Sequence, residues 1–351
     1  MSNPWNGKRI VVTGVCGTVG RELLCQVLQR GPGEVIGLDN NESELFFLAE
    51  ENRSGVPARF ALADIRSKDA LVEAFRGVDI VLHAAAFKHV VLCERSPRET
   101  IQTNILGTQN VIDAAVAAGV QRVLFTSSDK AVNPTNVMGT SKLMGERLVT
   151  AANAHRTVDG PVCVSTRFGN VLGSRGSVIP LFKRQIANGG PVTLTDSGMT
   201  RFIMTLQEAV HLVMDSVFLA RGGEVFVTKM RAVRIRDLAA IMIDELAPRY
   251  GRDASSIEVE VVGVKPGEKM YEELVNDEEV RRTVELDDYF VVVPAFKAIY
   301  QDIEYLYPRM LRSRIDRPYN SGLEESMSVN ELRDYLQCHQ LLDTEESECV
   351  S

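Results

Sequence analysis

Residues 9–20 read Arg-Ile-Val-Val-Thr-Gly-Val-Cys-Gly-Thr-Val-Gly, and this stretch decides the fold. Residues 9–13 form a β-branched run that ends at a glycine, and the helical pattern over 21–29 places its leucines and valine on one side. Strand, turn and helix then alternate along the first half of the chain, which predicts a parallel sheet with helices on both faces. The expected fold is therefore α/β, with a doubly wound sheet of the Rossmann type.

The same pattern places further elements along the chain. Strands are expected at 34–39, 59–64, 78–83, 122–127 and 162–167, and helices at 99–118 and 139–155. After Gly169 the rhythm becomes less regular, with strands expected at 192–194, 224–227 and 257–262 and helices at 206–219 and 235–246. We expect this second part to form a smaller lobe at the carboxyl edge of the main sheet, where ligands bind in such folds.

Composition excludes several classes of protein. The chain has 351 residues, a formal net charge of −8 and 45% hydrophobic residues, so we expect a globular protein without a nucleic-acid-binding or anionic-membrane surface. The chain has neither an apolar run of the ~18 residues that a spanning helix needs nor a signal-peptide pattern, so we expect a cytoplasmic protein without membrane insertion. Its six cysteines lack metal-ligand spacing, which favours reduced thiols and no metal site.

The glycines of residues 14–20 indicate a phosphate-binding turn. Glycine is needed where such a turn is tight and where backbone approaches a pyrophosphate, and the following helix offers free N–H groups. Asp39 follows at the end of the second strand, where a carboxylate would accept from an adenosine ribose and repel a 2′-phosphate. We therefore predict NAD as the cofactor. The residues expected to bind it here are Gly14, Cys16, Gly17, Thr18, Val19, Gly20 and Asp39.

Two further strand ends indicate contacts with the same cofactor. Asp64 and Ile65 follow the third strand, where a carboxylate suits the exocyclic amine of adenine; a helix N-cap is the alternative role of Asp64. His83 ends the fourth strand and is interpreted as a packing or positioning residue. Small residues that would let a dinucleotide lie against the backbone come next, namely Ala84, Ala85 and Ala86.

The segment Thr-Ser-Ser-Asp-Lys at 126–130 is the most informative part of the chain. A hydroxyl, a carboxylate and an amine lie side by side after the fifth strand, where the nicotinamide ring would arrive. Lys142 follows within a helix, and Met138 lies one turn before it on the same face. An exposed ion pair in a loop is the alternative interpretation of Asp129 and Lys130.

The chain resembles a known family over most of its length. The segments that carry the resemblance are the glycine turn with Asp39 and Asp64, Ser-Ser-Asp-Lys-Ala-Val-Asn-Pro-Thr-Asn-Val-Met-Gly-Thr-Ser-Lys (127–142), Arg-Phe-Gly-Asn-Val-Leu-Gly-Ser (167–174), Met-Thr-Arg-Phe (199–202), Lys-Pro-Gly-Glu-Lys-Met-Tyr-Glu-Glu-Leu (265–274), Pro-Tyr-Asn-Ser (318–321) and Met-Ser-Val-Asn-Glu-Leu-Arg (327–333). They are similar to the extended short-chain dehydrogenase/reductase superfamily, and within it to the polysaccharide-biosynthesis branch that contains UDP-N-acetylglucosamine 4,6-dehydratases.

The resemblance implies a nucleotide-sugar 4,6-dehydratase, with UDP-N-acetylglucosamine as the expected substrate. Hydride would leave carbon 4 of the sugar for NAD and later return to carbon 6. Lys130 would remove the proton on carbon 5, and Asp129 would protonate the hydroxyl that departs from carbon 6. Lys130 must then be uncharged, which burial or the nearby cation Lys142 would favour. Ser128 would bind the hydroxyl on carbon 4, and Lys142 would hold the nicotinamide ribose.

One position departs from the superfamily's usual pattern. The superfamily usually carries a catalytic tyrosine four residues before the lysine, and this chain has Met138, which cannot titrate. Because the dehydratase branch includes active members with methionine there, we expect an active enzyme. Asn104 is expected as a further cofactor contact.

A diphosphate bound by an acidic protein needs local cations. The resemblance implies substrate contacts from Lys88, Asn170, Arg175, Lys183, Arg201, Lys265 and Glu268. For Arg175 and Lys183, an exposed side chain that contacts only solvent is as well supported as a substrate contact. The expected domains are an NAD-binding domain at 1–168 to which later segments return, a region at 169–342 that is mainly the substrate-binding lobe and C-terminal extension, and a loose tail at 343–351.

Three rival functions stay open. A nucleotide-sugar 4-epimerase would also oxidise carbon 4 but needs no acid at carbon 6, so Asp129 and Lys130 argue against it. A reductase would consume free NAD(P)H, and Met138 would favour a non-catalytic NAD-binding regulatory protein. The resemblance also implies a homo-oligomer, while the nucleotide (UDP or GDP) and the stereochemistry at carbon 5 are left undetermined.

Overall fold

The structure divides the chain into two units. The computed structural model describes residues 3–52, 57–154, 160–173, 177–264, 267–296 and 303–343. The first unit comprises Met1–Phe168, Gln207–Lys229 and Leu274–Pro318, and the second comprises Gly169–Leu206, Met230–Glu273 and Tyr319–Ser351. The chain therefore leaves the first unit after Phe168 and returns to it twice.

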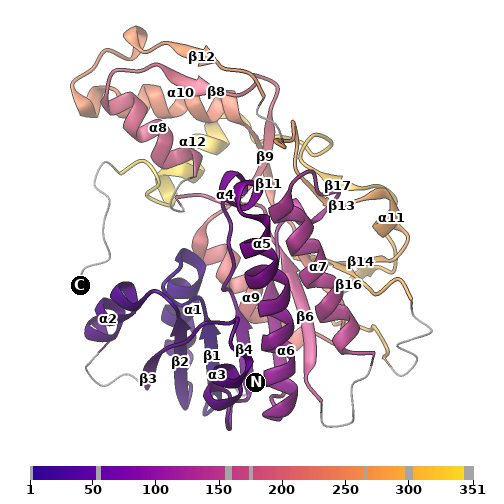
Figure 1. Ribbon diagram of the computed structural model, residues 1–351. Helices are drawn as coiled ribbons and strands as arrows, with labels where there is room; N and C mark the ends of the chain where they lie inside the picture. Colours follow the sequence, from indigo (N-terminus) through magenta and orange to yellow (C-terminus); the bar gives the residue numbers. More distant parts are fainter. Residues whose placement is uncertain are drawn as a thin grey trace. The chain divides into compact units, whose positions relative to one another are not determined.

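A ten-stranded sheet forms the centre of the first unit within the described residues (Figure 1). Seven strands are parallel, and in spatial order they are β3 (Ala58–Leu62), β2 (Glu34–Asp39), β1 (Arg9–Thr13), β4 (Ile80–His83), β5 (Arg122–Thr126), β6 (Val162–Arg167) and β10 (Val225–Thr228). Antiparallel pairs extend the sheet with β15 (Tyr289–Val292), β14 (Thr283–Leu286) and β16 (Met310–Arg312). The order from β3 to β6 is that of a Rossmann sheet, which confirms the predicted fold class.

Helices cover both faces of this sheet. The helices of the first unit are α1 (Thr18–Leu28), α2 (Glu42–Glu51), α3 (Lys68–Ala74), α4 (Val90–Arg95), α5 (Pro97–Thr100), a π-helix at Ile101–Leu106, α6 (Gly107–Ala117), α7 (Val137–Ala152), α9 (Leu206–Leu219) and α11 (Asp277–Val280). Consecutive residues Ile10, Val11 and Val12 of β1 are all buried, so the strand is apolar on both sides. On one side α3, α6 and α7 share a buried cluster with the strands.

Several expected elements differ by a few residues at their ends, for example the helix expected at 21–29, which is Thr18–Leu28, and two differences go further. The helix expected at 99–118 is interrupted, because a π-helix separates α5 from α6. The irregular turn directs Asn104 inward, where its side chain binds the backbone of Phe87. Helix α9 and strand β10 belong to the first unit and not to the smaller lobe, because Phe226 and its neighbours on β10 are buried between β6 and β15.

The second unit has its own core. In it β11 (Arg231–Arg234), β9 (Thr200–Met204) and β7 (Asn170–Val171) form one sheet, and β8 (Val192–Leu194) pairs with β12 (Val259–Val261). Helices α8 (Val178–Ala187), α10 (Ile235–Leu246) and α12 (Val329–Cys338) surround an apolar cluster that includes Phe182, Met242 and Leu332. The second unit also contains β17 (Tyr319–Asn320) and 3₁₀ turns at Pro248–Tyr250 and Ala254–Ser256. Strand β13 (Glu273–Val275) lies at the sequence boundary of the two units, and a further 3₁₀ turn at Asp129–Ala131 belongs to the first unit.

Helix α7 packs closely on strand β5. Gly145 of α7 is buried, and a Cβ atom built there would lie 2.6 Å from the ring of Phe125 on β5. The missing side chain therefore lets the helix approach the sheet. The Phe125 ring in turn lies under Lys142, whose amine is 4.8 Å from the ring centroid.

Replacing Gly145 with alanine should destabilise the protein by about 1–3 kcal/mol, because the added methyl group overpacks the Phe125 ring. Thermal unfolding of the purified variant measures this loss. The control is Arg147→Ala on the exposed side of the same helix, which should change the free energy of unfolding by less than about 0.5 kcal/mol. Equal stability of the two variants would contradict the close helix–sheet contact.

Candidate active site

The glycine turn after β1 has no room for side chains at two positions. Gly14 has φ = +70°, and a Cβ atom there would lie 2.7 Å from the backbone of Ala85. A Cβ atom on Gly20 would overlap the carbonyl oxygen of Gly14. Helix α1 has Gly17 as its N-cap, so no side chain caps the N–H groups of its first turn. A tight turn that leads into such a helix suits a pyrophosphate.

Asp39 lies beside this turn at the end of β2. Its carboxylate accepts hydrogen bonds from the N–H groups of Cys16 (2.9 Å) and Asn41 (3.0 Å). Burial and the nearby Asp39 charge raise the pKa of the Cys16 thiol to about 12, so this thiol stays neutral and unreactive. Thr18 and Val19 form the first residues of α1.

Asp64 follows β3 and is bound by a neighbouring arginine. The Arg66 guanidinium donates to both oxygens of the carboxylate at distances of 2.6 to 3.0 Å. This hydrogen bonding holds the pKa of Asp64 below its usual value. The N-cap of α3 is Ser67, so the alternative cap role of Asp64 does not apply to that helix. Ile65 is buried and lies against Gly107 at the start of α6.

Asn104 fixes the loop that follows β4. Its side chain accepts from the N–H of Phe87 (2.8 Å) and donates to the Phe87 carbonyl (3.0 Å). The same amide nitrogen donates to Ser141 of α7 (2.9 Å). The π-helix therefore joins α7 to the backbone next to three expected cofactor contacts, Ala84, Ala85 and Ala86.

His83 is buried between two hydroxyl groups. Its ring nitrogens lie 2.7 Å from Thr13 Oγ1 and 3.2 Å from Thr108 Oγ1. Burial and the positive charge of Lys142 lower the pKa of His83 to about 3. A proton shuttle needs a pKa close to the working pH, so this environment favours the packing or positioning role expected of His83.

Lys142 is buried at the carboxyl end of β5. Its amine donates to the carbonyl oxygen of Thr126 at 2.8 Å. Burial lowers the pKa of Lys142 to about 8, while Glu146, one helical turn further along α7, acts in the opposite direction. The lysine is therefore mostly protonated at neutral pH, but its charge is sensitive to its neighbours.

Ser128, Asp129 and Lys130 form a compact polar group after β5, here called the Ser128–Lys130 cluster. The Lys130 amine lies 3.1 Å from each carboxylate oxygen of Asp129. The Ser128 hydroxyl donates to Asp129 (2.7 Å) and accepts from the backbone N–H of Lys130 (3.2 Å). The side chain of Asp129 is 7% exposed and that of Lys130 is 34% exposed, so the pair is not the fully solvated ion pair of the alternative interpretation.

Met138 lies in the first turn of α7, one turn before Lys142, and is buried. Asn136 caps this helix by accepting from the N–H of Gly139 at 2.8 Å, which fixes where the helix begins. A thioether has no ionisable proton. Met138 therefore cannot exchange a proton, whereas the Ser128–Lys130 cluster contains a carboxylate and an amine that can.

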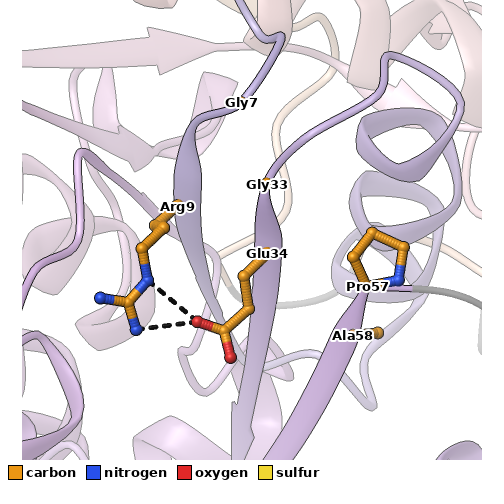
Figure 2. A pocket seen from close by; sticks show the side chains of 6 residues that line it. All are labelled: Gly7, Arg9, Gly33, Glu34, Pro57 and Ala58. Carbon is orange, nitrogen blue, oxygen red and sulfur yellow. Dashed lines mark hydrogen bonds and ion pairs between the residues drawn. The ribbon is translucent and has the colours of Figure 1, made fainter.

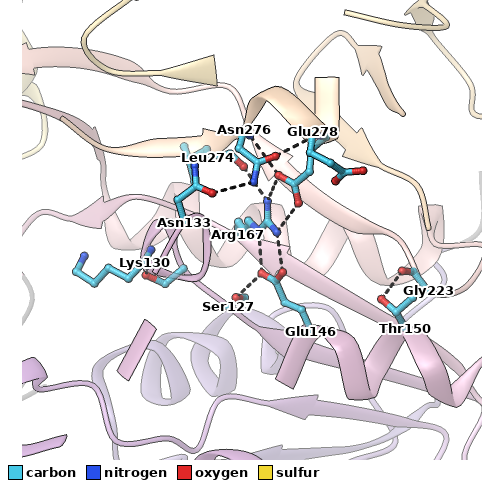
Figure 3. A network of polar contacts seen from close by, with 12 residues as sticks. Ser127, Lys130, Asn133, Glu146, Thr150, Arg167, Gly223, Leu274, Asn276 and Glu278 are labelled. Carbon is cyan, nitrogen blue, oxygen red and sulfur yellow. Dashed lines mark hydrogen bonds and ion pairs between the residues drawn. The ribbon is translucent and has the colours of Figure 1, made fainter. Parts of the chain in front are cut away.

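A buried ion cluster lies next to this segment, and sequence reasoning missed it (Figure 3). Arg167 of β6 pairs with Glu146 at 2.7 Å and with Glu279 at 2.8 Å, and none of the three side chains is more than 4% exposed. Ser127 donates to Glu146 at 2.6 Å. In the sequence only the motif at 167–174 indicated that Arg167 matters. Its partners Glu146 and Glu279 could not be inferred, because they lie 21 and 112 residues away.

The second unit holds several of the residues expected to contact substrate. Arg201 of β9 is mostly buried, and its guanidinium lies 3.6 Å from Glu268 and 3.5 Å from Glu272. Lys183 of α8 donates to the backbone carbonyl of Asp343 at 2.6 Å. Asn170 lies on β7.

The other expected substrate contacts are placed differently. Lys88 belongs to the first unit, is exposed, and follows the alanine loop after β4. Arg175 and Lys265 lie outside the described residues, as does most of the expected tail. Within the described part of the chain, no group of three or more potential metal ligands is found, and no helix is long and apolar enough to cross a bilayer.

A shallow pocket lies at the opposite edge of the sheet (Figure 2). It is lined from the amino ends of β1, β2 and β3 by Gly7, Arg9, Gly33, Glu34, Pro57 and Ala58. Arg9 and Glu34 pair with each other there at 2.8 Å. Ligands of doubly wound sheets bind at the carboxyl ends of the strands, so this pocket is not the candidate site.

A protein-family model described as "Polysaccharide biosynthesis protein" matches residues 10–294. The chain belongs to this family. The match covers the glycine turn, the Ser128–Lys130 cluster and β9, and it confirms the resemblance inferred from the sequence motifs.

Two relatives of this chain carry different activities in their names, and a third carries none. The UDP-N-acetylglucosamine 4,6-dehydratase (inverting) of Campylobacter jejuni is 36% identical over 86% of this chain and 87% of its own. A UDP-glucose 4-epimerase of Rickettsia canadensis is 38% identical over 81% of this chain and 82% of its own. An uncharacterized membrane protein of Methanocaldococcus jannaschii is 49% identical over 84% of this chain and 88% of its own.

Solved structures share the architecture. Pen from Bacillus thuringiensis is 40% identical, with a TM-score of 0.88 over 97% of this chain and 100% of that chain. DesIV, a dTDP-glucose 4,6-dehydratase from Streptomyces venezuelae solved with NAD and TYD bound, is 27% identical, with a TM-score of 0.63 over 75% of this chain and 86% of its own. NAD, the cofactor predicted from the sequence, is thus bound in a solved relative.

The low pKa of Lys142 predicts a pH-dependent stability. A lysine in the unfolded chain titrates near 10.5 and Lys142 in the fold near 8, so between these values the unfolded state binds one proton more and stability rises with pH. The gain should reach about 3 kcal/mol over the full range, of which about 2 kcal/mol falls between about pH 7.5 and about pH 10. Urea unfolding of the wild type and of Lys142→Met at about pH 7.5 and about pH 10 measures it. A stability difference between the two proteins that does not change with pH would refute the assignment.

Proposed function

We propose that this protein is an NAD-dependent nucleotide-sugar 4,6-dehydratase that converts UDP-N-acetylglucosamine to a 4-keto-6-deoxy sugar for polysaccharide biosynthesis. The observation that carries the proposal is the buried carboxylate of Asp129, 3.1 Å from the amine of Lys130, directly after β5. The 36% identity to the Campylobacter jejuni dehydratase supports it.

The residues at the sheet edge fit NAD. Gly14 and Gly20 keep side chains away from the turn where a pyrophosphate would lie, and α1 has no side-chain cap. Asp39 would accept from the ribose hydroxyls, and Lys142 would hold the nicotinamide ribose. When bound, NAD supplies an acceptor for the hydride of carbon 4 and a donor for carbon 6. The other proposed contacts are Cys16, Gly17, Thr18, Val19, Asp64, Ile65, Ala84, Ala85, Ala86 and Asn104.

The Ser128–Lys130 cluster would perform the proton transfers of the elimination. A ketone at carbon 4 acidifies the hydrogen on carbon 5, which Lys130 would remove, and Asp129 would protonate the hydroxyl that leaves carbon 6 as water. The ion pair of Asp129 and Lys130 and the corresponding neutral pair contain the same number of protons. One proton transfer across their 3.1 Å contact therefore produces both the acid and the base that the elimination needs.

Ser128 and Lys142 would prepare carbon 4. Ser128 would hydrogen-bond its hydroxyl, and the two hydrogen bonds that Ser128 makes within the cluster fix its orientation. Lys142, protonated at neutral pH, would stabilise negative charge that develops on the same oxygen. Met138 then serves as an apolar wall where the superfamily usually has its tyrosine.

Binding of the nucleotide diphosphate is assigned mainly to Arg201. A guanidinium can hold two phosphate oxygens at once, and Glu268 and Glu272 orient this one. The further proposed substrate contacts are Lys88, Asn170, Arg175, Lys183 and Lys265.

A nucleotide-sugar 4-epimerase is the second candidate, and the 38% identity to the Rickettsia canadensis epimerase favours it. Both reactions begin by oxidising carbon 4. An epimerase then returns the hydride to the other face of the same carbon and needs neither a base at carbon 5 nor an acid at carbon 6. Asp129 and Lys130 supply both groups, so the dehydratase accounts better for this pair.

Incubation of the purified protein with UDP-N-acetylglucosamine should give a 4-keto-6-deoxy sugar without consumption of added NADH, because the hydride returns to the product. Mass spectrometry detects the loss of one water, and alkaline absorbance detects the keto sugar. Conversion to the 4-epimer with unchanged mass would favour the epimerase. No conversion of this or other nucleotide sugars, with NAD still bound, would favour a non-catalytic protein.

Lys130→Ala should lower kcat for this product by about 10²–10⁴-fold, because a general base contributes a factor of this size. NAD content should be unchanged, since Lys130 is assigned to the substrate side. The matched control is Lys68→Ala, which removes a surface lysine of α3 that pairs with Asp113 and should leave turnover intact. Full activity of Lys130→Ala would exclude the lysine as the base.

A further inference from the structure

Beyond the reaction itself, we propose that Glu146 is a positioning residue of the candidate active site. It anchors the start of the Ser128–Lys130 cluster through the hydroxyl of Ser127, and it lies one helical turn from Lys142 on α7 and acts on that lysine. The effect on turnover rests on the proposed dehydratase function, whereas the effect on Lys142 does not.

Glu146 accepts three hydrogen bonds. Its Oε1 accepts from Ser127 Oγ at 2.6 Å and from Arg167 Nε at 2.8 Å, and its Oε2 accepts from a terminal nitrogen of Arg167 at 2.7 Å. The residue is 2% exposed. A buried carboxylate with three donors is held in one orientation, so it can hold Ser127 in turn.

Ser127 is the residue at which the polar cluster leaves the sheet. Its backbone N–H donates to the carbonyl oxygen of Thr166 on β6 at 2.7 Å, and its hydroxyl is the donor to Glu146. Ser128 follows directly and bonds to Asp129. A change in the direction of Ser127 would therefore displace the acid of the proposed reaction.

The ion cluster is also connected to Asn133, which follows the Ser128–Lys130 cluster in the sequence. Glu279 and Asn276 form a capping box at the start of α11, and the side chain of Asn276 donates to Asn133 at 3.3 Å. Asn133 adopts φ = +43° three residues after Lys130. Figure 3 shows Arg167 between Glu146 and Asn276, with Asn133 beside Asn276.

The charge on Lys142 depends on the groups around it. The titratable groups that act on this lysine are Glu146 from α7 and Cys93 from α4, and His83 from β4 is in turn affected by the lysine. His83 is neutral because burial and Lys142 lower its pKa to about 3. Burial lowers the pKa of Lys142 to about 8, and among the groups that raise it Glu146 is the strongest. Without Glu146 the lysine would lose its proton closer to neutral pH.

Glu279 provides a matched comparison. Like Glu146, it is buried, and it binds the same guanidinium through two hydrogen bonds of 2.8 and 2.9 Å. It is not among the groups that shift the pKa of Lys142, and the Ser127 hydroxyl donates to Glu146 instead. Glu146→Gln and Glu279→Gln each remove one negative charge next to Arg167. If Glu146 has only a structural role, both variants should therefore change the stability of the protein and the Lys142 titration to a similar extent.

The decisive experiment is an NMR titration of the full-length protein labelled with ¹³C at the lysine ε carbons. The Lys142 signal is assigned with Lys142→Arg. In Glu146→Gln the midpoint of the Lys142 titration should fall by about one pH unit, as for loss of a nearby opposite charge. In Glu279→Gln it should match the wild type, although both variants should unfold at lower temperature. An unchanged midpoint in Glu146→Gln, or equal shifts in both variants, would overturn the proposal.

Kinetics test the anchoring of the polar cluster. Ser127→Ala removes one hydroxyl and keeps every ion pair, so this variant should fold even if Glu146→Gln fails to fold. It should lower kcat for the keto sugar by about tenfold with little change in KM, because it misplaces groups that act in the transition state. Unchanged kcat would refute the anchoring role. If the wild type makes no keto sugar but the NMR midpoint shifts as expected, the dehydratase assignment fails while the role of Glu146 towards Lys142 stands.

Discussion

The parallel register of β1, β4 and β5 is the constraint on which the candidate site depends. Thr13, His83 and Phe125 are aligned at or next to the ends of these strands, so the glycine turn, the alanine loop and the Ser128–Lys130 cluster all begin at one sheet edge. His83 reinforces the alignment through its hydrogen bond to Thr13. A shift of β4 by one residue would turn its side chains to the opposite face and separate Ala85 from Gly14.

Two pairs of a carboxylate and a lysine lie at this edge of the sheet, and we assign them different roles. Asp129 and Lys130 are in direct contact at 3.1 Å, and the proposed elimination uses this contact for its proton transfer. Glu146 and Lys142 lie one helical turn apart on α7, and the lysine bonds instead to the carbonyl oxygen of Thr126, so this pair sets a charge and does not exchange a proton. The loss of the usual tyrosine at Met138 thus leaves a site whose ionisable groups are still organised by neighbouring carboxylates.

Features that depend on local pattern could be predicted from the sequence. Strands β2 and β6 have the predicted bounds because they are short apolar runs, and the glycine turn is recognisable because its spacing is fixed by backbone geometry. The π-helix could not be predicted, because Asn104 is drawn inward by a loop 17 residues away. Nor could the burial of Asp129 or the pairing of Arg167 with Glu279, since both depend on contacts between distant segments.

The position of Arg167 also has a consequence for how the protein is made. It lies one residue before the end of the first continuous segment of its unit, yet two of its hydrogen-bond acceptors, Leu274 and Glu279, arrive more than a hundred residues later. A nascent chain that has emerged only as far as Phe168 lacks both acceptors, so the guanidinium would depend on water for those hydrogen bonds. The full set of hydrogen bonds of Arg167 therefore becomes available only when the segment that contains Leu274 and Glu279 has been synthesised.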